Sequence, residues 1–326
     1  MLLYNQHSTP NTDCQGFERV LTDKSSTGRE RPWREKKQAN ELLSAIYEDV
    51  NTRKAERLAE CGDLLTFSIK DGTRKLKHMN SCRVRLCPLC AWRRSLKVHS
   101  HTVRILDAMD GDYAYIFLTL TVRNCEGEEL SKELDRLMGA WQRLTQRKAV
   151  RGVVKGWYRG LEVTHNINPE SASYDTYHPH FHCLLAVRKG YFTSKEYLSK
   201  AAWAQLWQQA LGVDYEPVVD VRRVKGTTSA AVAEAAKYTV KDADYIIPQD
   251  LDLSVETVRI LDDALDKRRL VAYGGLMKEW HQQLNLDDEV DGDLVNVGEE
   301  ETAAAVTDRE VIYAWHTGYS QYIRKD

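Results

Sequence analysis

The sequence predicts an α+β protein with a central antiparallel sheet of β-α-β-β-α-β order. Three observations predict it. Short runs rich in apolar and β-branched residues occur at 114–122, 157–165, 180–187 and 217–224. Segments with helical apolar spacing, 128–148 and 194–211, separate the first two runs and the last two. In this order the first and third strands normally form the central pair, and both helices cover one face.

Other elements flank this core. A polar, aperiodic stretch at 1–34 is expected to be poorly ordered, and 35–60 has the spacing of an amphipathic helix. The remaining expected elements are a strand at 64–70, a helix at 92–106, an Ala-rich helix at 229–241 and a strand or short helix at 311–323. The expected domains are 1–34, a helical and basic Cys-rich segment at 35–110, a catalytic core at 111–245, a helical extension at 246–286, and an acidic linker with a tail at 287–326.

Two finer points concern the helix at 194–211. We expect it to begin near Thr193 or Ser194, because a hydroxyl there can cap the first turn. Trp203 and Trp207 stand four residues apart and therefore share one helix face. We interpret them as core anchors against the sheet rather than as residues that stack on bases.

Composition indicates a globular protein with no membrane segment. Apolar residues make up 42% of the chain and charged residues 29%, and no run of eighteen apolar residues occurs. The N-terminus lacks the apolar core of a signal peptide, so a cytoplasmic location is expected.

The formal net charge of −2 conceals a strong separation of charge. Residues 74–106 hold nine Lys or Arg and no acidic residue, whereas 287–301 hold eight acidic residues and no basic one. The first segment indicates an anion-binding surface and the second a solvated linker.

A pair of histidines on the third strand is the first candidate for chemistry. Alternate side chains of a strand share a face, so His180 and His182 project together. Two neutral imidazoles side by side can supply half the ligands of a divalent metal. A solvated strand face is the alternative for an isolated pair.

Glu162 on the second strand is the candidate third ligand. It lies in an otherwise apolar and aromatic strand, where a carboxylate is costly to bury without a cation or a donor. An exposed carboxylate on an open sheet face is the alternative. His165 and His178 are weaker candidates, because His165 points to the opposite face and His178 precedes a proline.

The Ala-rich helix carries a second group of candidates. Glu234 and Tyr238 are four residues apart and so share a helix face. A tyrosine can attack phosphorus, and a nearby carboxylate can activate water. Lys237 and Lys241 flank the tyrosine and could hold a phosphate, or simply be solvated. Tyr245 is the rival nucleophile if the helix continues that far.

The basic segment contains three cysteines with zinc-like spacing, Cys82, Cys87 and Cys90. A fourth ligand is needed, and Cys61 is the first choice, with His78 or His99 as substitutes. Reduced core thiols are the alternative. If the cysteines hold zinc, the basic residues nearby are expected to bind DNA phosphates. These residues are Arg83, Arg85, Arg93, Arg94 and Lys97.

Three motifs in this order resemble those of the HUH endonucleases. They are FLTLT at 117–121, HPHFH at 178–182 and EAAKYTVKD at 234–242. Together with the cysteine segment at 82–97 they are most similar to the single-tyrosine replication initiators of rolling-circle plasmids from Gram-positive bacteria. The resemblance covers roughly residues 60–245 and implies the HUH nuclease fold, a ferredoxin- or RRM-like sheet.

The resemblance also implies roles. His180 and His182 would be the imidazole ligands of Mn²⁺ or Mg²⁺, and Tyr238 the nucleophile that leaves a 5′-phosphotyrosine and a 3′-hydroxyl primer. Glu234 would activate water when replication ends and the DNA is rejoined. Glu162 as third ligand rests on the strand argument together with analogy.

The implied partners are plasmid origin DNA, single-stranded at the nick within a hairpin, a host superfamily-one helicase and a single-strand binding protein. The sequence leaves a homodimer open. Two competing functions also stay open: an HUH relaxase or transposase, and a zinc-dependent DNA-binding regulator without catalysis.

Overall fold

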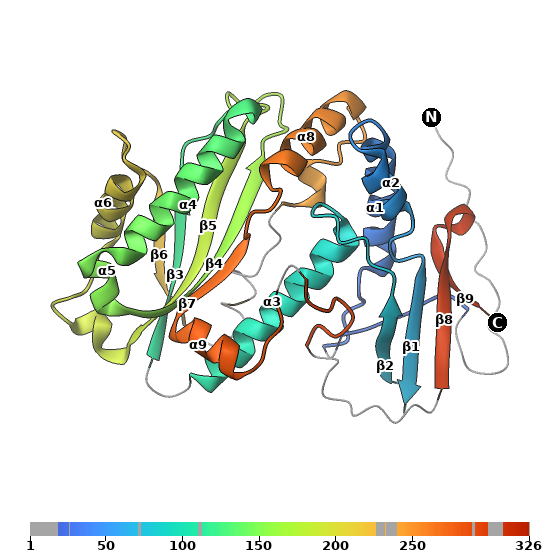
Figure 1. Cartoon of the computed structure of the whole chain (residues 1–326), viewed down its shortest axis with the longest axis horizontal. Coiled ribbons are helices and arrows are strands. Elements are labelled where there is room, and N and C mark those ends of the chain that lie inside the picture. Colours follow the sequence, from blue (N-terminus) through green and yellow to red (C-terminus); the bar gives the residue numbers. More distant parts are fainter. Residues whose placement is uncertain are drawn as a thin grey trace.

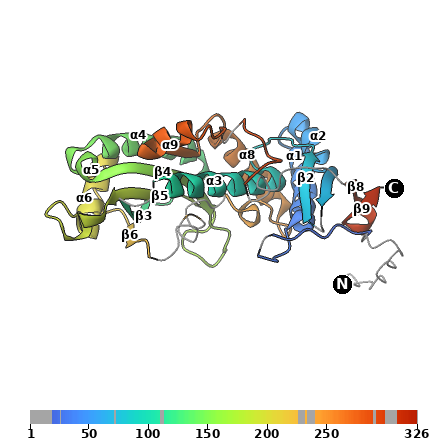
Figure 2. The ribbon, with the colours of Figure 1, turned by 90° about the horizontal axis from the view of Figure 1, so that it is seen from below.

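The computed structural model describes residues 19–25, 27–70, 73–109, 113–225, 232, 240–288, 291–298 and 309–325. Two antiparallel sheets lie toward opposite ends of the molecule (Figure 1). The long helix α3 (Pro88–Ala108) runs between them, as Figure 2 shows from below. Within the described ranges, no helix combines the length and the apolar character needed to cross a membrane.

The larger sheet confirms the predicted order. Its five strands run β6-β3-β5-β4-β7, and every pairing is antiparallel. The first four of these are the predicted strands, with β3 and β5 adjacent. The fifth, β7, was not predicted and pairs with β4. The bounds are β3 Tyr113–Thr121, β4 Val154–His165, β5 Tyr177–Arg188, β6 Val219–Arg223 and β7 Val271–Gly275.

Helices cover one face of this sheet, although their bounds differ from the prediction. The segment 128–148 is divided into the short turn η1 (Gly127–Glu129), α4 (Leu130–Gln146) and the start of α5 (Lys148–Val153), because Arg147 has an extended backbone. The helix α6 (Lys200–Leu211) begins later than predicted, after η2 (Lys189–Thr193). The Ser199 hydroxyl is its cap and accepts from the Ala202 amide at 3.2 Å.

The two tryptophans of α6 are core anchors, as predicted. Trp203 and Trp207 are both fully buried. The Trp207 indole nitrogen donates to the Thr121 carbonyl at 2.8 Å, which fixes α6 to the end of β3.

The opposite face of the sheet, which the predicted order leaves without helices, is in fact partly covered. The C-terminal half of α3 and the helix α9 (Leu276–Gln283) pack against it in a second apolar cluster. Ile105 and Met277 from these helices meet Phe117 and Leu184 from the strands. The end of this face that carries His180 and His182 lies outside the cluster.

The smaller sheet is built from both ends of the chain. Its order is β2-β1-β8-β9, with β1 Leu64–Lys70, β2 Thr73–Met79, β8 Arg309–His316 and β9 Gln321–Lys325. The tail segment whose structure the sequence left open is therefore a hairpin, closed by η4 (Thr317–Tyr319), whose first strand pairs with β1.

The predicted helix at 35–60 is in fact two helices. α1 spans Trp33–Glu48 and α2 spans Thr52–Ala59. Asn51 separates them, because its backbone is extended and its side chain caps α2 by accepting from the Lys54 amide at 3.1 Å. Two further elements, η3 (Asp242–Asp244) and α8 (Leu251–Ala264), follow the core.

The acidic segment is not a solvated linker where the structure describes it. Leu294 is 2% exposed and Val297 5%. The Arg93 side chain in α3 donates from Nε to the Leu294 carbonyl at 2.8 Å. The expectation of a solvated linker was wrong because this segment packs against α3, about 200 residues earlier in the chain. Arg93 of α3 donates to its backbone.

Candidate metal centres and functional site

Glu162 on β4 and His180 and His182 on β5 converge on one face of the larger sheet. The register of β4 and β5 places Glu162 directly opposite His180, and His182 lies two residues further along β5. Glu162 Oε2 lies 2.8 Å from His182 Nε2 and 3.5 Å from His180 Nε2. The three ligand atoms lie within 4.8 Å of one another, so together they could hold a metal ion.

Hydrogen bonds at the other ring nitrogens orient both imidazoles. His180 Nδ1 lies 3.1 Å from the His178 carbonyl and donates there, so Nε2 is the ring nitrogen that faces Glu162. His182 Nδ1 lies 3.3 Å from the Thr119 hydroxyl on β3. Sequence reasoning missed Thr119 as a supporting residue. Only the register of β3 against β5, which pairs Thr119 with His182, reveals it.

The electrostatics of the site favour a cation. Glu162 is 5% exposed, and burial by itself raises the pKa of a carboxyl group. The hydrogen bonds and charges of His180 and His182 outweigh burial and hold the pKa of Glu162 well below its usual range. The carboxylate therefore stays ionised inside the sheet, and a divalent ion could replace the protons that it now shares.

The two weaker histidine candidates lie outside this group. The His178 ring stacks on His180 at 5.2 Å between centroids but supplies no atom to the three-residue group. His165 points to the opposite side, as predicted. Its Nε2 lies 2.8 Å from Asp175 Oδ1, and its ring stacks on Tyr177 at 4.5 Å, so it has a structural role.

The residues predicted around the nucleophile are only partly described. Glu234, Lys237 and Tyr238 lie outside the described residues. Lys241 is described, and its ammonium lies 3.9 Å from Glu162 Oε1 with 57% of the side chain exposed. A positive charge therefore stands at the edge of the candidate metal site.

The rival nucleophile Tyr245 is in the core. It is 1% exposed, and its hydroxyl donates to the Leu86 carbonyl at 2.6 Å. The α-helix does not extend through 240–245, where a short 3₁₀ turn lies instead. The Tyr245 hydroxyl is therefore buried and engaged with the backbone rather than exposed to a DNA strand.

Four cysteines form a second candidate metal site. Cys61 Sγ lies 3.6 Å from both Cys87 Sγ and Cys90 Sγ, and Cys82 Sγ lies 3.8 Å from Cys90 Sγ. All four are buried and lie within the spacing of one ion's ligands. Four thiolates are the donor set of a structural zinc site. Cys61 is thus the fourth member, whereas His78 and His99 are not part of the group.

Local structure explains how the cysteines meet. Cys87 stands at the N-terminus of α3, immediately before Pro88, and Cys61 follows the end of α2. The Cys87 thiol donates to Asn40 Oδ1 at 3.0 Å. Hydrogen bonds from the neighbouring thiols, that of Cys61 first, hold the pKa of Cys90 well below its ordinary value, which favours a thiolate there.

Comparison with known proteins now gives the family. A family profile described as "Replication protein" matches residues 73–323. The chain belongs to this family of replication proteins. It is 42% identical over 336 residues to a "Protein rep" of Bacillus amyloliquefaciens, covering 94% of this chain and 97% of that one. It is 37% identical to a "Protein rep" of Lentilactobacillus hilgardii, covering 93% and 98%. No solved structure matches the chain. The resemblance to replication initiators seen in the motifs is confirmed.

Three of the basic residues that were expected to bind DNA are buried in this replication protein. Arg93 is 0% exposed, Lys97 1% and Arg94 8%. Arg93 Nη2 donates to the Val295 carbonyl at 2.6 Å, and Lys97 pairs with Asp287. This placement contradicts the expectation for these three residues, because Lys97 pairs with Asp287 and both arginines donate to backbone carbonyls.

The other two basic residues lie nearer the surface. Arg83 is exposed and donates to the Gly292 carbonyl at 3.2 Å, and Arg85 is half-buried and donates to the Arg268 carbonyl at 3.1 Å. For both, contact with DNA stays a prediction.

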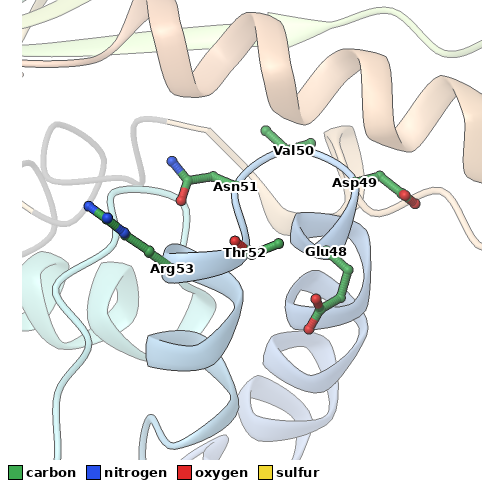
Figure 3. A pocket seen from close by; sticks show the side chains of 6 residues that line it. All are labelled: Glu48, Asp49, Val50, Asn51, Thr52 and Arg53. Carbon is green, nitrogen blue, oxygen red and sulfur yellow. The ribbon is translucent and has the colours of Figure 1, made fainter.

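A surface depression lies elsewhere on the replication protein. Glu48 to Arg53, at the turn between α1 and α2, line it (Figure 3). None of the candidate metal ligands lines this depression. It therefore contributes nothing to the candidate sites described above.

Proposed function

We propose that this replication protein initiates rolling-circle replication by nicking single-stranded DNA at a plasmid origin. The observation that carries the proposal is the convergence of Glu162, His180 and His182 on β4 and β5, with Lys241 beside them. A divalent ion held there would polarise the scissile phosphate and offset its developing charge. Glu162 contributes the negative charge, and the two imidazoles contribute neutral nitrogen donors.

The donor set favours Mn²⁺ over Mg²⁺. Two imidazole nitrogens and one carboxylate suit manganese, whereas magnesium prefers oxygen ligands. The hydrogen bonds at both Nδ1 atoms hold the rings with Nε2 facing Glu162, so the protein itself orients these two nitrogens.

Tyr238 is the proposed nucleophile. It precedes Lys241 by three residues, and three residues of chain span at most about 11 Å, so we assign it to the neighbourhood of Glu162, which Lys241 approaches. Its hydroxyl would attack the phosphorus in line, and the 3′-oxygen of the preceding nucleotide would leave as the primer end. Lys241 would hold a phosphate oxygen or stabilise the phenolate, with Lys237 contacting DNA nearby.

Glu234 is proposed to act at termination. It precedes Tyr238 by four residues in the sequence and would take a proton from water, which then resolves the regenerated origin. A single tyrosine then suffices for one round of nicking and rejoining.

The four cysteines are proposed to hold zinc. The ion would close the loop between α2 and α3 and so stabilise the helical segment, as structural zinc does in small domains. Origin DNA with a hairpin, a host superfamily-one helicase and a single-strand binding protein are the proposed partners, and a homodimer is open.

The test uses an oligonucleotide that carries the candidate nick site in a hairpin loop. Wild-type protein with Mn²⁺ should form a covalent adduct, and chelation or Tyr238→Phe should abolish it. Tyr245→Phe is the matched control and should form adduct at a normal rate. DNA binding without any adduct would instead support a non-catalytic regulator.

A further inference from the structure

Arg123 is held in place beside the candidate nicking site. It follows the end of β3 and is exposed. Its guanidinium lies over the ring of Tyr215, 3.9 Å from the centroid, and its backbone amide donates to the Tyr215 hydroxyl at 3.2 Å. Two contacts with one tyrosine thus restrict both the backbone and the head group of the arginine.

The register of the sheet places this pair next to the metal-ligand histidines. Thr121 on β3 is directly opposite His180 on β5. Arg123 lies two residues further, about 7 Å along the chain direction at strand spacing. The distance is comparable to the span of one or two nucleotides beside the scissile phosphate.

The loop that carries Tyr215 is fixed to the same strand end. The Val218 carbonyl accepts from the Thr121 hydroxyl at 2.9 Å and from the Thr121 amide at 3.4 Å. The Val218 side chain is 72% exposed, which is unusual for a β-branched apolar residue. The surface beyond the histidines therefore offers a fixed cation and an apolar contact.

The Arg123 guanidinium has N–H groups available to bind a ligand. Among the residues that the structure describes, Arg123 makes no ion pair, and its head group contacts the ring of Tyr215 rather than an acceptor oxygen. A planar fork of N–H groups held next to a site for a phosphodiester matches the geometry of a second phosphate.

We propose that Arg123, presented by Tyr215, binds a backbone phosphate of single-stranded DNA within about two nucleotides of the nick. Val218 contacts the adjacent sugar or base. The proposal rests on the proposed function for the position of the nick. It goes beyond that function by assigning a subsite that fixes the register of the strand on the enzyme.

The first experiment measures binding without cleavage. In a Tyr238→Phe background, the affinity for a 20-nucleotide oligo-dT is measured across a range of salt concentrations. Arg123→Gln should weaken binding about tenfold at low salt. It should also reduce the slope of log affinity against log salt by about 0.7, the value for one phosphate contact to a single strand.

Two variants make the result specific. Tyr215→Leu removes the ring but keeps the charge, so it should weaken binding by about two- to fivefold with the slope unchanged. Arg188→Gln removes an equally exposed arginine at the far end of β5 and should change neither quantity. Unchanged slope and affinity in Arg123→Gln would overturn the proposal.

The second experiment locates the phosphate. Neutral methylphosphonate linkages are placed one at a time around the nick mapped with wild-type protein. At one linkage within two nucleotides of the nick, the methylphosphonate and Arg123→Gln should each weaken binding, and together no more than either alone. Additive effects at every linkage would contradict the assignment. If wild-type protein forms no adduct, the proposed function fails, whereas the oligo-dT result still decides whether Arg123 contacts phosphate.

Discussion

Replacing Glu162 by glutamine tests the candidate metal centre without DNA. The substitution keeps the shape of the side chain and one oxygen ligand but removes the negative charge. In the structure Glu162 Oε2 lies 2.8 Å from His182 Nε2 and 3.5 Å from His180 Nε2. An ion between these atoms would lie within about 4 Å of the carboxylate, where a divalent cation and a carboxylate interact by about 8 kcal/mol at an effective dielectric constant of 20.

Part of that energy is offset when the ion and the carboxylate lose water, and the amide oxygen still binds the metal. We therefore expect a net loss of about 3 kcal/mol, which corresponds to about 100- to 200-fold weaker Mn²⁺ binding. Calorimetric titration of Mn²⁺ into zinc-loaded protein measures it directly. Glu126→Gln, at an exposed carboxylate outside the site, should bind Mn²⁺ like wild type. An affinity of Glu162→Gln within threefold of wild type would refute the assignment of Glu162 as a ligand.

Three further predictions concern stability and the zinc site. Burial lowers the pKa of His101 to about 4, below the ordinary 6.5 that it regains on unfolding, so the unfolded chain binds more protons between these values. The free energy of unfolding should therefore fall by about 1–3 kcal/mol as the pH drops from 6.5 to 4, and His101→Gln should flatten this dependence in denaturant titrations. Cys61→Ser should lose zinc by elemental analysis, whereas Cys183→Ser, at a buried thiol in the large sheet, should keep it; equal zinc content in both would exclude Cys61 as a ligand. Tyr245→Phe should lower the free energy of unfolding by about 1–2 kcal/mol through loss of its bond to Leu86, and a loss of covalent adduct instead would make Tyr245 the nucleophile.

The sequence predicted the core of the fold because its strands carry their own signal. The four predicted strands of the larger sheet are short runs rich in apolar and β-branched residues, and the order of strands and helices leaves few ways to pair them. The strands that were missed lack this signal. β2 (Thr73–Met79) is rich in basic residues, and β7 (Val271–Gly275) is short and ends in two glycines, so each becomes a strand only because a partner strand is present.

The metal ligands could be predicted where they lie close together in the sequence or on neighbouring predicted strands. His180 and His182 are two residues apart, and Glu162 follows from strand parity, whereas Thr119 becomes visible only once β3 and β5 are paired. Contacts between distant segments were not predictable. The burial of Arg93 depends on an acidic segment about 200 residues away, and no local pattern distinguishes such an arginine from one that faces DNA.

The central claim is that Tyr238 attacks DNA at a metal centre formed by Glu162, His180 and His182. The most direct measurement is mass-spectrometric mapping of the peptide that carries nucleotide after reaction with the nick-site oligonucleotide and Mn²⁺. The account predicts a single modified peptide with the 5′-phosphate of the cleaved strand on Tyr238, absent when metal is removed. Nucleotide attached to any other residue, or an adduct that forms equally well without a divalent metal, would contradict it.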